Sequence, residues 1–345
     1  MTAEAHQPIL SVKNLRVWYG TPRGAAQAVD GVSLDIGPGE AVGLVGESGC
    51  GKSTLGRALM GLTPDSAARD GQIYYRGQDV LRLGRRGMHA LRGPEIGLIF
   101  QEPMTRLNPL LRIHDHFRET LRAHEPGLSK DEIKRRSLET LGHVGIPPTR
   151  FHQYPHEFSG GMRQRIMIAL ALVLRPKLLI ADEPTTSLDV LVEAQILRLL
   201  KDLQRDYGTA LLLITHNLGI VAEACDRMAV MYAGRVAEDG PVHEVFAEPG
   251  HPYTRELLRS TISLSTRNLS HIPGSPPNLV HPPAGCRFHP RCPDAMQVCR
   301  QKVPRITDLG GGQHVACWRH GPESAIPAGG RAPLEQETVD VADEA

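Results

Sequence analysis

The chain has 345 residues, room for about two domains of ordinary size, and its 41% hydrophobic content is enough for a sizeable core. Its formal net charge of +1 does not favour nucleic acid or an acidic surface as a general partner. Residues 1–8 are polar and lack the apolar stretch of a signal peptide, and the longest apolar run, residues 166–174, is far shorter than the roughly 20 residues that cross a bilayer. We therefore expect a cytosolic chain that meets a membrane only through a partner.

The pattern of apolar residues predicts an α/β fold. Residues 9–19 and 29–36 read as two strands of a β-rich N-terminal subdomain, separated by a turn that contains glycine and proline. Short, nearly unbroken apolar runs follow, which are typical of strands buried on both faces of a parallel sheet. These runs are residues 41–45, 98–100, 178–181 and 211–214. A helical stripe lies between the last two runs and contains Val192, Ile196, Leu199, Leu200 and Leu203.

A glycine-rich loop follows the predicted strand at residues 41–45. Its residues are Gly46, Glu47, Ser48, Gly49, Cys50, Gly51, Lys52, Ser53 and Thr54. Such a loop turns several backbone N–H groups into one concavity that suits a phosphate chain, and the helix expected from Ser53 onward adds the positive end of its dipole. We expect Lys52 to reach the outer phosphates and the Ser53 hydroxyl to coordinate Mg²⁺. The loop is therefore interpreted as a nucleotide site.

Residues 104–175 differ from their surroundings, because they are mostly helical in pattern, contain several prolines and show no convincing strand. We predict a helical subdomain inserted into the sheet domain. Near its end, Ser159 is a good helix N-cap, and Gly160 and Gly161 leave the backbone free for contact with an anion. Taken alone, this segment is only a capped helix.

The apolar run at residues 178–181 ends in two acids, Asp182 and Glu183. At the carboxyl end of a buried strand, Asp182 can approach a Mg²⁺ ion held by Ser53, and Glu183 can act as the general base that polarises a water for attack on the terminal phosphoryl group. The alternative is an acidic pair that caps the following helix. The glycine loop earlier in the chain favours the first interpretation.

Four of the six cysteines lie close together in a proline-rich, loop-like region, at Cys286, Cys292, Cys299 and Cys317. In a cytosolic chain this favours metal binding over disulfides, the alternative being unligated buried thiols. The intervening segments of five, six and seventeen residues lack the Cys-x₂-Cys pairs of common zinc sites, and the Cys292–Pro293 pair is similar to ferredoxin ligation, so we expect a [4Fe–4S] cluster with zinc as the alternative. His289 and His314 are substitute ligands, whereas Cys50 and Cys225 read as plain thiols.

Together these motifs resemble an ATP-binding cassette (ABC) ATPase over residues 8–260. The resemblance rests on the glycine loop and on four further segments, residues 159–164, 182–183, 187–189 and 215–216. It implies that Gln101 touches Mg²⁺ and faces a membrane subunit, and that Tyr19 stacks on adenine. It also implies that Asp189 lies in the loop joining two ATP sites and that His216 contacts the γ-phosphate. An ordinary strand aromatic at Tyr19 and a core histidine at His216 are the alternatives.

In the resembling family, ATP lies between the glycine loop of one domain and the Ser-Gly-Gly segment of another. This chain has one set of motifs, so we expect it to need a second ATPase subunit, identical or homologous, with a homologous heterodimer partner favoured. The tail, at residues 273–277, 285–293 and 316–318, resembles the C-terminal extension of dipeptide/oligopeptide importer ATPases, as do residues 154–157 and 108–109. Some members of that group bind [4Fe–4S] through the four cysteines. The chain departs from the family at Cys50, Arg106, Phe158 and Asn217, and Arg106 bears on the coupling contacts.

The resemblance predicts the ATP-hydrolysing subunit of a peptide importer, peripheral at the cytoplasmic face of the membrane, with ATP and Mg²⁺ as cofactors. Its expected partners are two membrane-spanning permease subunits and, indirectly, an external substrate-binding protein, but not nucleic acid. The expected organisation is an ABC ATPase domain (1–260), a metal-binding extension (261–322) and a disordered tail (323–345). Alternatives are an importer ATPase for nickel or other small solutes, a soluble ABC-type ATPase acting on nucleic acid, and an iron–sulfur sensor with a vestigial ATPase.

Overall fold

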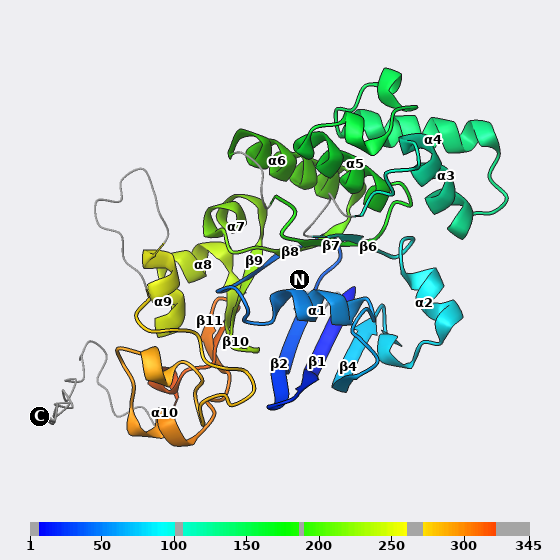
Figure 1. Ribbon diagram of the computed structural model, residues 1–345. Coiled ribbons are helices and arrows are strands. Elements are labelled where there is room, and N and C mark those ends of the chain that lie inside the picture. The colour runs from blue at the N-terminus through cyan, green and yellow to red at the C-terminus, as the bar shows by residue number, and fades with distance from the viewer. Residues whose placement is uncertain (1–6, 101–105, 186–189, 261–271, 322–345) are drawn as a thin grey trace, which may run out of the picture.

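An eight-stranded sheet forms the centre of the protein in the computed structural model, which describes residues 7–100, 106–185, 190–260 and 272–321 (Figure 1). The strand order is β11-β12-β10-β9-β3-β8-β7-β6. The strands are β3 (Ala41–Val45), β6 (Ile96–Ile99), β7 (Leu178–Asp182), β8 (Ala210–Ile214), β9 (Arg227–Tyr232), β10 (Arg235–Pro241), β11 (Thr307–Gly310) and β12 (Gln313–Val315). Neighbours from β6 to β9 pair in parallel, and the pairs from β9 to β11 are antiparallel.

The predicted α/β architecture is confirmed. Every residue of β3, β7 and β8 is buried, as expected for apolar strands covered on both faces of a parallel sheet. The strands β9 to β12 were not predicted, because they are short or contain charged residues, glycine and proline, as β10 does at Asp239, Gly240 and Pro241.

A second, antiparallel sheet has the order β2-β1-β4-β5. It contains the two predicted N-terminal strands, β1 (Leu10–Thr21) and β2 (Gly24–Ile36), together with β4 (Ala67–Tyr75) and β5 (Gln78–Asp79). The Arg69-Asp70-Gly71 sequence interrupts the alternation of β4, which explains why that strand was not predicted.

Helix α1 (Lys52–Leu59) lies between the two sheets (Figure 1). Its buried residues Leu55, Ala58 and Leu59 belong to one hydrophobic cluster with residues of β1 and β2 and with residues of β3, β7 and β8. This packing fixes the start of α1, and therefore the glycine-rich loop before it, at the carboxyl end of β3.

The inserted subdomain is helical, as predicted, and no strand occurs between residues 106 and 175. Helices α3 (Ile113–His124), α4 (Lys130–His143) and α5 (Gly160–Leu172) share an apolar cluster with α6 (Val190–Tyr207) and with the central sheet. These helices lie on the side of the large sheet opposite the four-stranded sheet (Figure 1). The remaining helices described before residue 261 are α2 (Arg85–Leu91), α7 (Leu218–Ala224), α8 (Val242–Ala247) and α9 (Pro252–Arg259).

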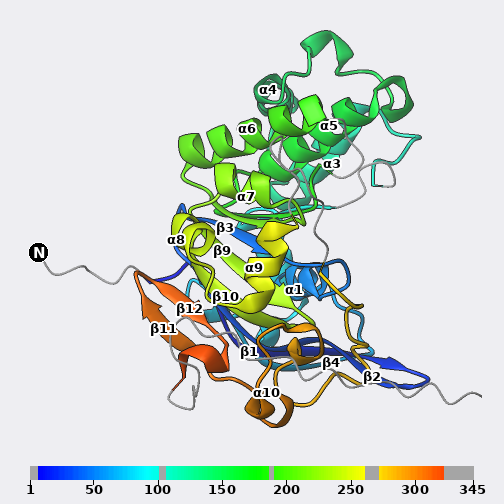
Figure 2. The same cartoon turned by 90° about the vertical axis from the view of Figure 1, so that its left-hand side faces the viewer.

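The cysteine-rich extension packs against the two sheets (Figure 2). Its strand β12 pairs with β10, and the Gln27 N–H donates a hydrogen bond of 2.9 Å to the Leu279 carbonyl. Residues 272–293 are irregular apart from a 3₁₀ turn, as predicted, and α10 (Gln297–Gln301) follows. The predicted disordered tail, residues 323–345, lies outside the described residues. Among the helices that the structure describes, none has the length and apolar character needed to span a membrane.

Candidate nucleotide site and cysteine-rich extension

The glycine-rich loop connects β3 to α1 and packs tightly against its surroundings. A Cβ atom added to Gly46 would lie 2.1 Å from the Met231 carbonyl oxygen, and one added to Gly51 would lie 2.0 Å from the Ala28 carbonyl oxygen. Both positions also have positive φ values of 150° and 108°. Only glycine fits at these two positions, so the loop can hold its backbone N–H groups around an anion at the start of α1.

Lys52 is 5% exposed, and its Nζ donates hydrogen bonds to the carbonyl oxygens of Gly46 (2.7 Å) and Glu47 (3.1 Å). A pocket of about 180 Å³ adjoins it. The pocket is lined by Ala28, Ser48, Gly49, Gly51, Lys52, Ser53, Thr54 and Glu183. Residues from the loop, the helix start and the end of β7 therefore surround one concave space. Burial raises the pKa of the neighbouring Cys50 thiol above its ordinary value.

Ser53 and Asp182 meet at the edge of this pocket, where Ser53 Oγ donates a hydrogen bond of 2.9 Å to Asp182 Oδ1. Burial is the main cause that raises the pKa of Asp182, and the hydrogen bond from Ser53 opposes that effect. Two adjacent oxygen ligands, one of them a carboxylate that is poorly solvated, are the donor set that Mg²⁺ prefers. The residues present fit this ion.

Glu183 has a positive φ of 46°, an uncommon backbone conformation for a residue with a side chain. Its N–H donates to the Ile214 carbonyl at 2.8 Å, and its Oε1 lies 3.5 Å from His216 Nδ1. The Glu183 side chain is 15% exposed, whereas that of His216 is 65% exposed, so this histidine is not a core residue. Strained backbone of this kind concentrates at functional sites, and here it turns Glu183 toward the pocket.

The Ser-Gly-Gly segment lies elsewhere, at the start of α5. Ser159 caps this helix by accepting a hydrogen bond from the Met162 N–H at 3.4 Å. None of residues 159–164 lines the pocket around Lys52. Gln164 connects the two regions, since its side-chain amide donates a hydrogen bond to the Pro184 carbonyl directly after Glu183. The sequence carries no local signal for this contact of the buried Gln164.

Tyr19 lies on β1, opposite Ala26 of β2 and Ala67 of β4, and is partly buried against the core. The structure therefore places it on the four-stranded sheet and not in the pocket lining. Gln101 and Asp189 lie outside the described residues.

The four cysteines of the extension lie near one another. Burial raises the pKa of Cys292 and of Cys317 to about 12, and in both cases the neighbouring Cys286 contributes to the rise. The Cys286 N–H also donates to the Cys299 carbonyl at 2.8 Å. Within the described ranges, however, no group of three or more histidine, cysteine or acidic side chains is arranged to hold a metal ion. The ligand types fit a thiolate-bound metal centre, but the thiols are not arranged around one in this structure.

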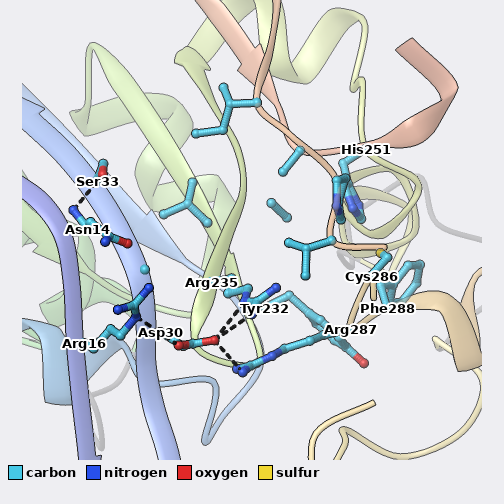
Figure 3. A pocket seen from close by; sticks show the side chains of 17 residues that line it. Asn14, Arg16, Asp30, Ser33, Tyr232, Arg235, His251, Cys286, Arg287 and Phe288 are labelled. Carbon is cyan, nitrogen blue, oxygen red and sulfur yellow. Dashed lines mark hydrogen bonds and ion pairs between the residues drawn. The ribbon is translucent and has the colours of Figure 1, made fainter. Parts of the chain in front are cut away.

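A larger pocket of about 270 Å³ lies between the four-stranded sheet and the extension. Figure 3 shows that two of its lining residues, Arg235 and Arg287, converge on a third, Asp30. None of the residues of the glycine-rich loop lines it. Phosphate recognition requires the backbone N–H groups of that loop, so the smaller pocket around Lys52 is the candidate nucleotide site.

Comparisons with known proteins agree with this geometry. The ABC transporter family profile matches residues 29–186, and the profile of the oligopeptide/dipeptide transporter C-terminal region matches residues 237–299. The dipeptide transport ATP-binding protein DppD of Bacillus subtilis is 48% identical over 90% of this chain and 95% of its own length. The oligopeptide transport ATP-binding protein OppD of Salmonella typhimurium is 46% identical over 92% of this chain and 96% of its own length.

Solved structures give the same result for the fold. A dimeric ATP-binding cassette in a post-hydrolysis state with ADP and phosphate is 27% identical, with a TM-score of 0.62, over 68% of this chain and 98% of that chain. The cbiO1 protein of Clostridium perfringens, part of an ABC transporter complex, is 32% identical, with a TM-score of 0.61, over 70% of this chain and 91% of that chain.

Proposed function

The chain belongs to the ABC transporter family, among its dipeptide and oligopeptide transport ATP-binding proteins, and from this premise we propose that it is the ATP-hydrolysing subunit of a peptide importer. The single observation that carries the assignment is the similarity to such proteins across both the ATPase region and the cysteine-rich extension. The extension matters because its profile is that of oligopeptide/dipeptide transporters, whereas the two solved cassettes cover only 68% and 70% of this chain.

We propose the following roles at the ATP site. The backbone of the glycine-rich loop and Lys52 hold the phosphates, Ser53 and Asp182 hold Mg²⁺, and Glu183 accepts a proton from the attacking water. Mg²⁺ neutralises charge on the transferred phosphoryl group when it is bound. The 3.5 Å distance between Glu183 and His216 supports a role for this histidine beside the terminal phosphate. Tyr19 as an adenine contact, Gln101 as a Mg²⁺ contact and Asp189 in the connecting loop remain predictions.

Hydrolysis requires a second ATPase subunit in this proposal. Ser159, Gly160 and Gly161 lie outside the pocket of their own chain, so they are available to close the site of a partner. The dimeric state of the similar cassette with ADP and phosphate supports this arrangement. A homologous partner subunit is the version that we propose.

We further propose that the region around Phe100 to Leu110 transmits the closure of the dimer to two membrane-spanning subunits, which would place the chain at the cytoplasmic face of the membrane. Leu110 is 82% exposed, the highest value among the large hydrophobic residues that the structure describes. The Arg106 guanidinium lies 4.5 Å from the centre of the Phe100 ring. Arg106, one of the residues at which the chain departs from the family pattern, therefore lies within this proposed coupling region.

The test is reconstitution. Purified from its native membrane, the chain should bring two membrane-spanning subunits with it, and vesicles containing this complex should accumulate labelled peptides when ATP is supplied. Replacing Lys52 with alanine should abolish the accumulation of labelled peptides but leave the subunits of the complex associated. Co-purification of nucleic acid, or of neither class of partner, would contradict the proposal.

We also propose that Cys286, Cys292, Cys299 and Cys317 bind a [4Fe–4S] cluster, with zinc as the alternative. The proximity of the four thiols supports this, and a four-thiolate ligand set is used by both centres. Because the thiols are not arranged around a metal in this structure, their side chains must rearrange when it binds. Protein purified without oxygen should contain iron and sulfide and absorb near ~400 nm; stoichiometric zinc without iron would identify the alternative.

A further inference from the structure

A side chain of the cysteine-rich extension contacts the glycine-rich loop directly. Arg291 comes immediately before Cys292, and its side chain is 5% exposed. Its Nη1 lies 2.7 Å from Glu47 Oε2, and its Nη2 lies 2.9 Å from Glu47 Oε1. Two parallel, charge-assisted hydrogen bonds of this kind fix both direction and distance. A residue 244 positions away in the sequence thus holds the second residue of the phosphate loop.

The guanidinium of Arg291 is itself held in place. Its Nε donates to the Pro273 carbonyl at 2.8 Å and its Nη2 to the Ile272 carbonyl at 3.2 Å. Its Nη1 also donates to the Tyr232 hydroxyl at 3.2 Å. The hydrogen bonds to Glu47 raise the pKa of Arg291, so the guanidinium stays charged. The arginine is therefore a fixed anchor and not a flexible surface group.

The backbone of Glu47 is held as well. Its N–H donates a hydrogen bond of 2.9 Å to the hydroxyl of Tyr253, a fully buried residue of α9. Its carbonyl oxygen accepts the hydrogen bond from Lys52 Nζ. The carboxylate, the N–H and the carbonyl of Glu47 each have a partner, and two of these partners come from outside the loop.

A second contact reaches the middle of the loop through the turn between β9 and β10. Arg287, which follows Cys286, donates hydrogen bonds to the Ala233 carbonyl in this turn and to Asp30 Oδ2 (Figure 3). The next residue of the turn, Gly234, donates its N–H to the Cys50 carbonyl at 2.8 Å. Two arginines, each adjacent to a cysteine of the extension, thus support the loop at Glu47 and at Cys50.

We propose that Arg291 is a positioning residue for ATP binding, which holds the phosphate loop through Glu47 in the conformation that accepts phosphates. The apparent dissociation constant of a ligand equals the intrinsic one divided by the fraction of protein in the binding-competent conformation. By increasing that fraction, the extension sets the nucleotide affinity of the ATPase domain. Linkage is reciprocal, so bound nucleotide in turn stabilises the docked extension. The inference rests on the nucleotide site and does not depend on which solute is transported.

The test is a double-mutant cycle in the full-length chain with MgADP, which binds without being hydrolysed. The dissociation constant is measured for the wild type, Arg291→Ala, Glu47→Gln and the double variant. If the competent fraction falls to about one tenth, each single variant binds about tenfold more weakly. The double variant should bind no more weakly than the weaker single variant, because both changes remove one interaction. Arg300→Ala, an exposed arginine of the same extension, is the matched control and should bind as the wild type does.

Two further readouts separate positioning from a general loss of stability. MgADP should slow hydrogen exchange of residues 272–321 in the wild type but not in Arg291→Ala. In steady-state hydrolysis with the partner subunit, KM for ATP should rise while kcat at saturation changes little, and Arg291→Lys should recover part of the affinity. Dissociation constants within twofold of the wild type in Glu47→Gln would overturn the proposal even if Arg291→Ala does not fold. The proposal would also be overturned if the loss of binding free energy in the double variant equalled the sum of the losses in the two single variants.

Discussion

Glu183 is the residue on which the chemistry of the site depends most directly. We expect Glu183→Gln to keep ATP binding, because the amide has nearly the same shape, and to lower kcat by about a hundredfold or more, the usual contribution of a general base. The variant should accumulate as a closed dimer with MgATP, seen by size-exclusion chromatography. Hydrolysis at the wild-type rate would refute the assignment.

Asp182 provides a prediction with a pH dependence. Burial raises its pKa above the ordinary value of 3.8, so the stability that this group contributes is complete below pH 3.8 and is lost as the pH rises through the raised value. Above that raised pKa the ionised carboxylate therefore destabilises the nucleotide-free protein. Asp182→Asn should melt at the same or a higher temperature without nucleotide, in thermal unfolding monitored by circular dichroism.

The same variant should lose the increase in melting temperature that MgATP gives the wild type, because the metal loses its carboxylate. Asp206→Asn, whose side chain is 61% exposed, is the control and should keep that increase. A lower melting temperature without nucleotide, combined with an undiminished effect of MgATP, would contradict the proposed metal role.

Among the elements, sequence patterns predicted those whose local signal is complete. The strands β3 and β8 are short runs without polar side chains, and β7 is such a run up to its last residue, Asp182, so a few consecutive residues are enough to predict their burial. Helix α6 was predicted from residues that recur at helical spacing. The strands β4, β10 and β12 depend on pairing with distant strands. β12 has only three residues, and its place in the sheet comes from β10.

The same distinction applies to the site. Gly46 to Thr54 form a contiguous motif, and the sequence predicted that Asp182 can approach a Mg²⁺ ion held by Ser53. In the structure these two residues share a hydrogen bond, while their roles in metal binding remain predictions. The contact between Glu47 and Arg291 had no signal in the sequence, because nothing in the two segments relates them until the extension folds onto the loop. The hydrogen bond from the Gln164 side chain to the Pro184 carbonyl could not be predicted from the sequence for the same reason.

The cysteine-rich extension should behave as one metal-dependent element. We expect Cys292→Ser to lose the bound metal and to speed hydrogen exchange over residues 272–321, because a thiolate ligand is removed from a segment with little regular structure of its own. Metal content and exchange mass spectrometry provide the measurement. Cys225→Ser is the control, since this thiol lies outside the extension; full retention of metal in Cys292→Ser would exclude that cysteine as a ligand.

At the scale of the whole molecule, the loop around Lys52 and the Ser-Gly-Gly segment do not meet within one chain. The loop around Lys52 lies at the end of β3, between the two sheets, while Ser159 caps α5 in the helical subdomain (Figure 1). If the Ser-Gly-Gly segment closes the site of a partner, as we propose, then water exclusion and complete contacts to the terminal phosphate require another subunit. The extension adds a third region that contacts the loop from the side of β9 and β10.

The most direct measurement is the rate of ATP hydrolysis per chain as a function of protein concentration, alone and with the partner subunit, with the association state followed by light scattering. The account predicts that turnover per chain falls toward zero as the protein is diluted into monomers and is restored by the partner subunit. Constant turnover per chain at concentrations where only monomers are present would contradict it.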